Sequence, residues 1–482
     1  MDHRQRLRDL PLVILALFVA ASLPETHPLA AVLEVDHGGP SPYHTIQSAI
    51  NAAVAGTDSV LVHCGIYQEN VTMRDRVNLT GAGAACTAID GGANGQSAVR
   101  MVGVSSSTFL KGFTITNGRS ALGGGIYVES GSPLITLNVI TGNRAVASGG
   151  SGGYGGGIHV TSPVGGESLL VTAPTISRNI IRANSADRFG GGMEIYTDDG
   201  TTVANNLIKE NTAVQAGGGI DTYQSFPTIL NNTIVRNCQQ GVGTACVQGG
   251  GGISLTNSGV VAIGNNLIAF NEAAIGGGGV DMAASTATFQ SNDAYLNTPV
   301  NYSGVANPTG SNGNVSVDPL LDTEANSFSG HQPRSNSPLV EATSTAPAND
   351  LPGIPRPVDA DADGTAKGDI GARENEGITR VRFTSRTSLT WDTSAGPLAT
   401  YNLYRGDIQT LRTTGIYTQD PNTVPGARRQ CALGSPSATD LNTPALGKAF
   451  FYLAVVKRAA EGTLGFNSLP SERPYTNANR CP

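Results

Sequence analysis

The hydrophobic and polar positions of this chain follow one pattern that returns six times between Gly123 and Asn297. Each return opens with a run of glycines and one aliphatic residue, and later contains the phrase Asn-x-aliphatic-x-x-Asn. The aliphatic openers are Ile126, Ile158, Met193, Ile220, Ile253 and Val280. They lie 32, 35, 27, 33 and 27 residues apart. Self-similarity at such a period is typical of a solenoid with one coil per repeat.

The phrases within each repeat predict strands. They are short, rich in Ile, Val and Thr, and bounded by Gly or Asn, whereas helical repeats need longer uninterrupted stretches with a period of 3.6. Such phrases stack in parallel about 4.8 Å apart. Glycine and asparagine would then occupy corners where the backbone has positive φ, and stacked Asn side chains can hydrogen-bond along the axis. We therefore expect an all-β fold, a right-handed parallel β-helix.

Two segments precede the repeats. Arg4, Arg6 and Arg8 stand before an apolar stretch from Leu10 to Ala21, which is followed by small residues. This order predicts a secretory signal over residues 1–31, because the stretch is shorter than the about 20 residues of a membrane span. Residues 43–53 read as a short helix with Thr45 at its N-cap, and this helix would cover the open end of the first coil.

The start of the repeat region resembles a known family. The run TIQSAINAAVAGTDSVLVHCGIYQENV (residues 45–71) is similar to the opening of bacterial pectin-lyase-like β-helix proteins. Those proteins continue with an L-x-G coil and an I-D-G coil, which Leu79 to Gly81 and Ile89 to Gly91 match. The glycine and Asn phrases also resemble the repeats of polymorphic outer-membrane adhesins. We expect one continuous β-helix over residues 32–375.

The tail of this region resembles a second family. GNVSVDPLL (313–321), SPLVEA (337–342) and DLPGIPRPVDADADGTAKGDIGARE (350–374) are similar to the choice-of-anchor Q region of exported proteins. The resemblance spans residues 313–375 and implies export and a place at the cell surface more than any chemistry. We expect a secreted or surface-located monomer with no membrane span in its mature form.

The last segment, residues 377–482, alternates apolar and polar positions around Trp391, Tyr401 and Tyr404. This alternation predicts a small β-sandwich with the three aromatic residues between its sheets. The segment resembles a fibronectin type III-like domain. We expect it to be a spacer or a cap over the end of the helix, with ligand binding as the alternative.

Composition narrows the possible partners and predicts cross-links. The chain has 482 residues, 14% charged residues and a net charge of −7, without a Lys/Arg run past its first ten residues, so we expect no nucleic-acid partner. Its six cysteines favour disulfides in an exported protein. A separation of about one coil brings Cα atoms within disulfide reach. The expected pairs are Cys64–Cys86, Cys238–Cys246 and Cys431–Cys481.

Candidate chemistry lies on the strands that follow the glycine runs. The residue after each aliphatic opener should point outward, which gives the row Tyr127, His159, Glu194, Asp221, Ser254 and Asp281. Two residues further on, a parallel row contains Glu129, Thr161, Tyr196, Tyr223, Thr256 and Ala283. Carboxylates about 5 Å apart on adjacent strands push each other's pKa values apart, as acid/base catalysis on a glycosidic bond requires. The tyrosines offer flat faces to sugar rings, and the glycine runs should keep the adjacent corner low.

Three functions are compatible with this face. The first is non-catalytic binding of a polysaccharide or cell-surface glycan through Tyr127, Glu194, Tyr196, Asp221 and Tyr223. The second is a polysaccharide lyase or glycoside hydrolase that acts on an acidic or plant-type polymer with His159, Glu194 and Asp221. The third is a structural spacer or adhesin whose polar face only confers solubility. The sequence lacks the catalytic signatures of pectate lyases, polygalacturonases and pectin methylesterases, which favours binding over catalysis.

One acidic segment has the look of a calcium loop. Asp359, Asp361 and Asp363 alternate before Gly364, as carboxylates do in such loops, but the twelfth position is Ile370 and not Glu. We expect weak calcium binding there and no other cofactor. The alternative is a solvated acidic turn.

Overall fold

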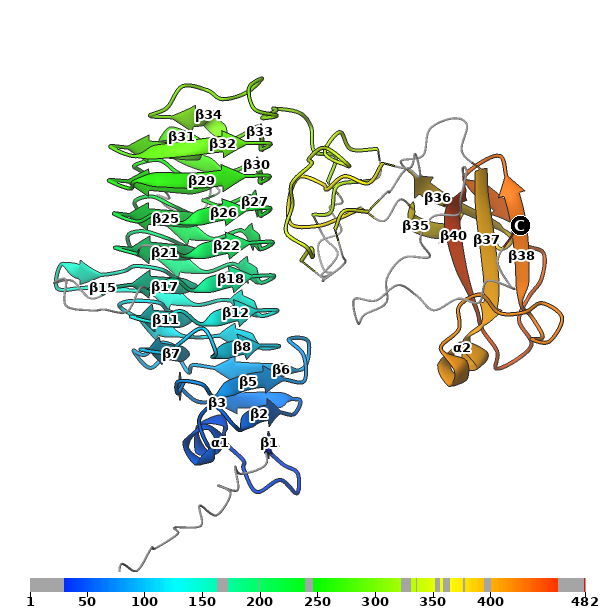
Figure 1. The fold of residues 1–482 in the computed structure, drawn as a ribbon, viewed down its shortest axis with the longest axis horizontal. Helices are drawn as coiled ribbons and strands as arrows, with labels where there is room; N and C mark the ends of the chain where they lie inside the picture. Colours follow the sequence, from blue (N-terminus) through cyan, green and yellow to red (C-terminus); the bar gives the residue numbers. More distant parts are fainter. Residues whose placement is uncertain are drawn as a thin grey trace, which may run out of the picture.

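The computed structural model describes residues 30–162, 172–198, 200–238, 246–321, 331–334, 336–351, 356–358, 365–375, 378–393, 400–457 and 481. Residues 1–29 of the predicted signal, the predicted calcium ligands Asp359, Asp361 and Asp363, and parts of the C-terminal segment lie outside these ranges. Stacked strands form a column with one short helix at its first coil (Figure 1). In the part of the chain that is described, no helix is long and apolar enough to cross a membrane.

Three parallel sheets run along the column. Sheet 1 contains β1 (Val32–Val35), β2 (Ser59–Val62), β5 (Asn78–Gly81), β8 (Phe109–Lys111), β12 (Leu134–Thr136), β18 (Thr175–Ser177), β22 (Thr202–Ala204), β26 (Thr228–Leu230), β29 (Val260–Gly264) and β32 (Thr286–Gln290). Sheet 2 contains β3 (Gly65–Gln68), β6 (Thr87–Asp90), β9 (Thr114–Thr116), β13 (Val139–Thr141), β19 (Ile180–Arg182), β23 (Leu207–Lys209), β27 (Thr233–Val235), β30 (Leu267–Ala269) and β33 (Asp293–Tyr295). Sheet 3 contains β4 (Val71–Thr72), β7 (Val99–Val102), β11 (Ile126–Glu129), β17 (Ile158–Thr161), β21 (Met193–Tyr196), β25 (Ile220–Tyr223), β28 (Ile253–Thr256), β31 (Glu272–Ala283) and β34 (Thr298–Ser303).

Two smaller sheets lie at the corners that lead into sheet 3. A parallel sheet pairs β10 (Arg119–Ser120), β14 (Arg144–Ala145), β20 (Ser185–Ala186) and β24 (Thr212–Ala213). A hairpin of β15 (Ala147–Ser148) and β16 (Ser151–Gly152) projects from one coil just before Tyr154.

The aliphatic openers form a stack inside the column. Ile126 pairs with Ile158, Ile158 with Met193 and Met193 with Ile220, and the pairing continues through Ile253 to Val280. All six are completely buried in one core with the inward residues of sheets 1 and 2. The register is therefore fixed, because a shift by one residue would exchange the core side with the outer side. The predicted right-handed parallel β-helix is confirmed.

Two ladders of asparagine side chains turn the chain at either end of each sheet 2 strand. In each ladder the Nδ2 of one Asn donates to the Oδ1 of the next at 2.9–3.2 Å. The first ladder contains Asn138, Asn179, Asn206, Asn232, Asn266, Asn292 and Asn314. The second contains Asn143, Asn184, Asn211, Asn237, Asn271, Asn297 and Asn301. The expected hydrogen bonding along the axis is confirmed.

Positive φ occurs at the residue before each Asn of the first ladder. That residue is Asn205, Asn231 or Asn265 in three coils, as expected, but it is Leu137 (φ 59°) and Arg178 (φ 58°) in two others. The ladder asparagines themselves contribute buried hydrogen bonds between successive coils. The glycine runs pack against the second ladder: a Cβ on Gly125 would lie 2.6 Å from the carbonyl oxygen of Gly157 and 2.9 Å from the Nδ2 of Asn143.

The first coil is closed as the sequence predicts. Helix α1 (Ile46–Ala52) buries Ile46, Ala49 and Ile50, and the Thr45 side chain accepts a hydrogen bond from the Ser48 amide at its N-cap. The Glu69 carboxylate accepts hydrogen bonds from the Ile46 and Gln47 amides at 2.7 and 3.0 Å. All three expected disulfides, Cys64–Cys86, Cys238–Cys246 and Cys431–Cys481, are present.

The column ends earlier than expected. Among the described residues, the last parallel strand of the column, β34, ends at Ser303, with one further bridge between Asp293 and Val315. The expectation of one continuous helix up to residue 375 is therefore wrong. The described part of residues 331–375, here called the strap, folds back along the outer face of sheet 2. Leu339, Leu351, Ile370 and Ala372 bury a row of sheet 2 side chains that includes Val139, Ile180, Leu207, Val235 and Leu267.

The C-terminal segment contains two antiparallel sheets. One pairs β35 (Ile378–Phe383), β36 (Ser388–Thr393) and β39 (Ser437–Thr439), and the other pairs β38 (Arg428–Leu433), β37 (Thr400–Asp407) and β40 (Phe450–Lys457), with α2 (Ile408–Thr414) after β37. Trp391 and Tyr401 pack together, as expected, with ring centroids 5.7 Å apart. Tyr404 lies in a separate cluster with Val455 and Cys481, since it points to the other face of β37. The likeness to a fibronectin type III-like domain stays a prediction.

Candidate functional site

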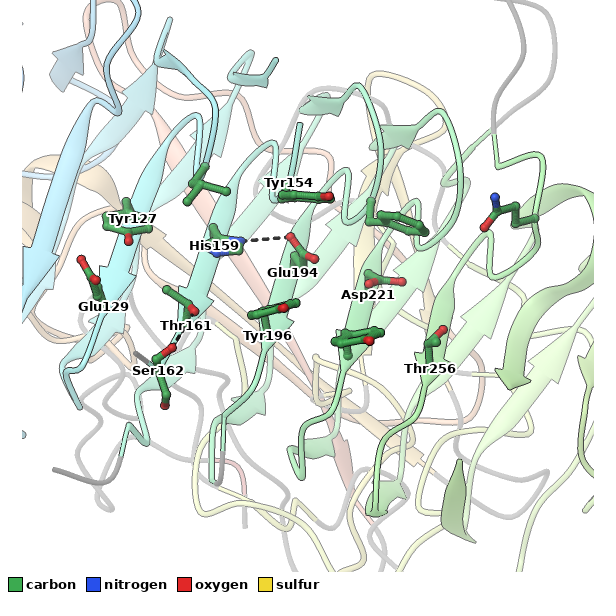
Figure 2. Close-up of a pocket in the computed structure, with 14 residues that line it drawn as sticks. Tyr127, Glu129, Tyr154, His159, Thr161, Ser162, Glu194, Tyr196, Asp221 and Thr256 are labelled. Atoms are coloured by element: carbon green, nitrogen blue, oxygen red, sulfur yellow. Dashed lines mark hydrogen bonds and ion pairs between the residues drawn. The ribbon is translucent and has the colours of Figure 1, made fainter. Parts of the chain in front are cut away.

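A groove of about 560 Å³ runs across the strands of sheet 3. Its floor contains Tyr127, His159, Glu194 and Asp221, from β11, β17, β21 and β25. These residues are direct neighbours in the parallel register, as the sequence predicts. Figure 2 shows them in one line along the groove.

The floor residues are buried, which contradicts the expectation of an exposed row. His159, Glu194, Asp221 and Ser254 are each only 3% exposed, and Tyr127 is 8% exposed. They do point away from the hydrophobic core, because they alternate with the buried openers along each strand. Asp281, at the far end of the same row, stays half-buried. The burial comes from side chains on both sides of the row.

One wall explains this burial and was missed in the sequence. Leu122, Tyr154 and Phe189 each lie just before a glycine run and follow one another in a ladder of isolated parallel bridges. The rings of Tyr154 and Phe189 stack with centroids 6.1 Å apart and line the groove. The corner is therefore tall and aromatic, and the expectation that glycine runs keep it low is wrong. The available signal was a large residue immediately before each of the first three glycine runs, although the next coil has Ala216 at this position.

The opposite wall is the second predicted row. Glu129, Thr161, Tyr196, Tyr223 and Thr256 line the groove, and all are half-buried. Tyr196 and Tyr223 stack with centroids 5.3 Å apart and an angle of 7° between their planes. Ala283, the last residue of this row, is exposed and is not among the lining residues. The groove therefore has aromatic surfaces on both sides of a polar floor (Figure 2).

The polar groups of the floor interact closely. The Nδ1 atom of His159 lies 3.0 Å from the Oε2 atom of Glu194, and both side chains are buried. The ring of His159 also stacks on that of Tyr127 at 5.9 Å. Burial raises the pKa of Tyr127 to about 12, with the nearby Glu129 carboxylate acting in the same direction.

Asp221 places a buried carboxyl group on the floor of the groove. Burial, and next the charge of Glu194, raise the pKa of Asp221 well above its ordinary value, against a hydrogen bond from Ser254. Its Oδ1 atom is buried and has no hydrogen-bond partner within the described residues. A buried carboxyl oxygen without a partner is costly, and such groups cluster at functional sites.

Metal binding finds no further support in the described residues. No group of three or more His, Cys, Asp or Glu side chains in those residues is arranged to hold a metal ion. The predicted calcium ligands Asp359, Asp361 and Asp363 lie outside the described residues, so calcium binding stays a prediction.

Comparisons with known proteins give several similar solved structures and one family match. The solved structures that resemble the chain include the pectate lyase Pel9A, with 12% identity over 72% of this chain and 96% of that chain and a TM-score of 0.41. They also include the pectin methylesterase from Aspergillus niger, with 13% identity over 61% of this chain and 94% of that chain and a TM-score of 0.32. Tailspike protein 2 from Escherichia coli O157:H7 bacteriophage CAB120 has 12% identity over 87% of this chain and 63% of that chain and a TM-score of 0.34. No curated protein matches the sequence. A family model described as the right-handed β-helix region matches residues 63–294, the part of the chain in which the six repeats and the groove lie.

Proposed function

We propose that the groove of sheet 3 binds one chain of a polysaccharide that lies along the axis of the column. The observation that carries this proposal is the pair of aromatic walls, Tyr196 and Tyr223 on one side and Tyr154 and Phe189 on the other. Sugar rings present apolar faces that pack on aromatic rings, while their hydroxyl groups need polar partners. The floor supplies such partners in Glu194 and Asp221.

The charge of the groove favours a neutral or amino-sugar polymer. Glu129, Glu194 and Asp221 line it, and none of the described lining residues is Lys or Arg. Two guanidinium groups contact aromatic residues of the groove: Arg100 lies over the Tyr127 ring of the floor, and Arg188 donates a hydrogen bond to the Tyr154 hydroxyl of one wall at 3.0 Å. A uronate carboxylate about 4 Å from an ionised floor acid would be disfavoured by about 4 kcal/mol at an effective dielectric constant of 20. A polyuronate is therefore a poor ligand.

Binding to a polysaccharide panel tests the proposal. Retention on neutral polymers such as xylan, mannan and β-glucan, on chitosan, and on polygalacturonate and alginate should be measured for the wild type and for Tyr196→Ala/Tyr223→Ala. We expect retention on a neutral or amino-sugar polymer and a loss of at least tenfold in affinity in the double variant. The double variant should remain folded, because the lost ring stacking is worth about 0.5–1.5 kcal/mol.

Tyr295→Ala is the matched control. Tyr295 is also half-buried, but it lies on β33 of sheet 2 and packs against Phe270. This variant should bind as the wild type does. Equal retention of the wild type and the double variant would show that any ligand binds outside the groove.

A further inference from the structure

Asp221 has the environment of an acid that keeps its proton until a ligand arrives. Its side chain is 3% exposed and lines the groove, and its Oδ1 atom has no hydrogen-bond partner within the described residues. Ser254 donates a hydrogen bond to the Asp221 carboxyl group, but the Oδ1 atom does not receive it. The hydroxyl or glycosidic oxygen of a bound sugar is the kind of partner that this atom lacks.

A second carboxyl group stands beside it. Glu194 occupies the paired position on the neighbouring strand, and its Oε2 atom lies 3.0 Å from the Nδ1 atom of His159. The other titratable groups that line this part of the groove are Tyr154, Tyr196 and Tyr223. Two acids therefore share one buried place, and one of them is paired with an imidazole. Environments that differ in this way separate a proton donor from a charged stabiliser.

We propose that the groove hydrolyses the glycosidic bonds of the polymer it binds, with Asp221 as the general acid and Glu194 as the carboxylate that faces the anomeric carbon. This inference rests on the proposed function, since the substrate must lie in the same groove. Paired residues on adjacent parallel strands are about 4.8 Å apart, so both groups can reach one sugar linkage.

The proposed reaction consumes water as its co-reactant, and Asp221 ends the cycle with its proton restored. Asp221 gives its proton to the glycosidic oxygen while the bond from that oxygen to the anomeric carbon breaks, and the electron pair stays with the leaving oxygen. The Glu194 carboxylate stabilises the positive charge that develops at the anomeric carbon. Water then supplies hydroxide to that carbon and returns a proton to Asp221. Elimination is disfavoured, because it requires a uronate whose charge is neutralised, and the described groove lining has no Lys or Arg to do so.

The release of reducing ends tests the inference. Wild type, Asp221→Asn and Glu194→Gln should be incubated with the polymers of the binding panel, and Asp281→Asn is the matched control. Asp281 lies in the same row, but it is not among the described residues that line the groove. We expect the wild type and Asp281→Asn to release reducing ends, and the other two variants to lose at least 100-fold, as removal of a general acid does.

A second substrate separates a chemical role from a structural one. A nitrophenyl glycoside of the same sugar has a leaving group that needs no proton. Asp221→Asn should regain most of its activity on it, and Glu194→Gln should not. Wild-type activity on the polymer should fall as the pH rises and Asp221 loses its proton.

The possible failures are distinguishable. Groove-dependent binding without new reducing ends would overturn hydrolysis and leave the binding proposal intact. Unsaturated products, or equal loss of activity by Asp281→Asn and Asp221→Asn, would also overturn hydrolysis. The absence of any groove-dependent binding would overturn both proposals.

Discussion

At the scale of single residues, alternation along a strand predicts direction but not exposure. The sequence correctly places His159, Glu194 and Asp221 on adjacent strands, pointing away from the core. It does not predict their burial, because the covering side chains Tyr154 and Phe189 belong to corners of variable length before the glycine runs. The native register itself therefore carries the free-energy cost of burying the carboxyl groups of Glu194 and Asp221. Acidic side chains that stay buried although some of their oxygen atoms lack hydrogen-bond partners are candidates for a functional role.

Asp293 gives a test of such burial away from the groove. Its Oδ1 accepts a hydrogen bond from the Val317 amide at 3.0 Å, and its Oδ2 has no partner within the described residues. Burial, with the nearby Asp318 acting in the same direction, raises the pKa of Asp293 to about 7. The protonated form is thus favoured in the folded state. The stability that protonated Asp293 contributes is complete below about pH 4 and is lost as the pH rises through about 7.

We therefore expect Asp293→Asn to stabilise the protein increasingly between pH 4 and pH 7. The gain over the wild type should approach about 4 kcal/mol at pH 8, since each pKa unit is worth about 1.4 kcal/mol. Chemical denaturation at a series of pH values measures it. The difference between the two proteins isolates Asp293, because Asp221, Asp369 and Glu374 have raised pKa values in both. Parallel stability curves would contradict the expectation.

At the scale of elements, the repeat was readable because strand, turn and ladder positions all recur in fixed order. The openers and the Asn phrases each appear in the sequence where the structure uses them. The turns were predicted only in part: Gly and Asn occupy many of the positive-φ positions, as expected, but residues as different as Leu137 and Arg178 occupy others. Adjacent hydrogen bonds hold these backbones in place, so residue type alone does not reveal them.

The Asn ladders should be costly to interrupt. Asn206 donates through Nδ2 to the Ile176 carbonyl at 2.8 Å and to Asn232 Oδ1 at 3.0 Å, and its own Oδ1 accepts from Asn179. Asn206→Ala would leave several buried groups without partners, at about 1–3 kcal/mol each. We expect at least about 3 kcal/mol lower unfolding free energy, measured by denaturation.

Asn51→Ala is the control for this change. Asn51 is exposed on α1, and its replacement should alter stability by less than about 0.5 kcal/mol. A ladder variant as stable as this control would mean that water or a neighbouring coil replaces the lost bonds.

At the scale of the whole molecule, the strap is the part that the sequence could not predict. Residues 331–375 have no period, and their partners lie far away in the sequence: Ala372 donates to Thr233, and Arg356 to Asn205. Arg356 also lies 2.9 Å from Glu374, with both side chains fully buried. The residues that carry the resemblance to the choice-of-anchor Q region thus hold the strap on sheet 2. The export and the place at the cell surface that this resemblance implies stay predictions.

Arg356→Met should therefore weaken the attachment of the strap. It would leave the buried Glu374 and Asp369 without their cation, which typically costs about 3–5 kcal/mol. Denaturation should show the loss, and limited proteolysis should cut the strap faster. Arg334→Met, at an exposed position of the same strap, should change stability by less than about 0.5 kcal/mol. Equal behaviour of the two variants would show that apolar contacts alone hold the strap.

The register of sheet 3 has a consequence for the design of this protein. The coils of β11, β17, β21 and β25 each contribute one floor residue and one buried opener, and the openers Met193 and Ile220 are 27 residues apart. A duplicated or deleted block of that length would keep every inner contact and change the groove by one step of about 4.8 Å. The length of the groove is thus set by the number of coils, and it can be edited without redesigning the interior.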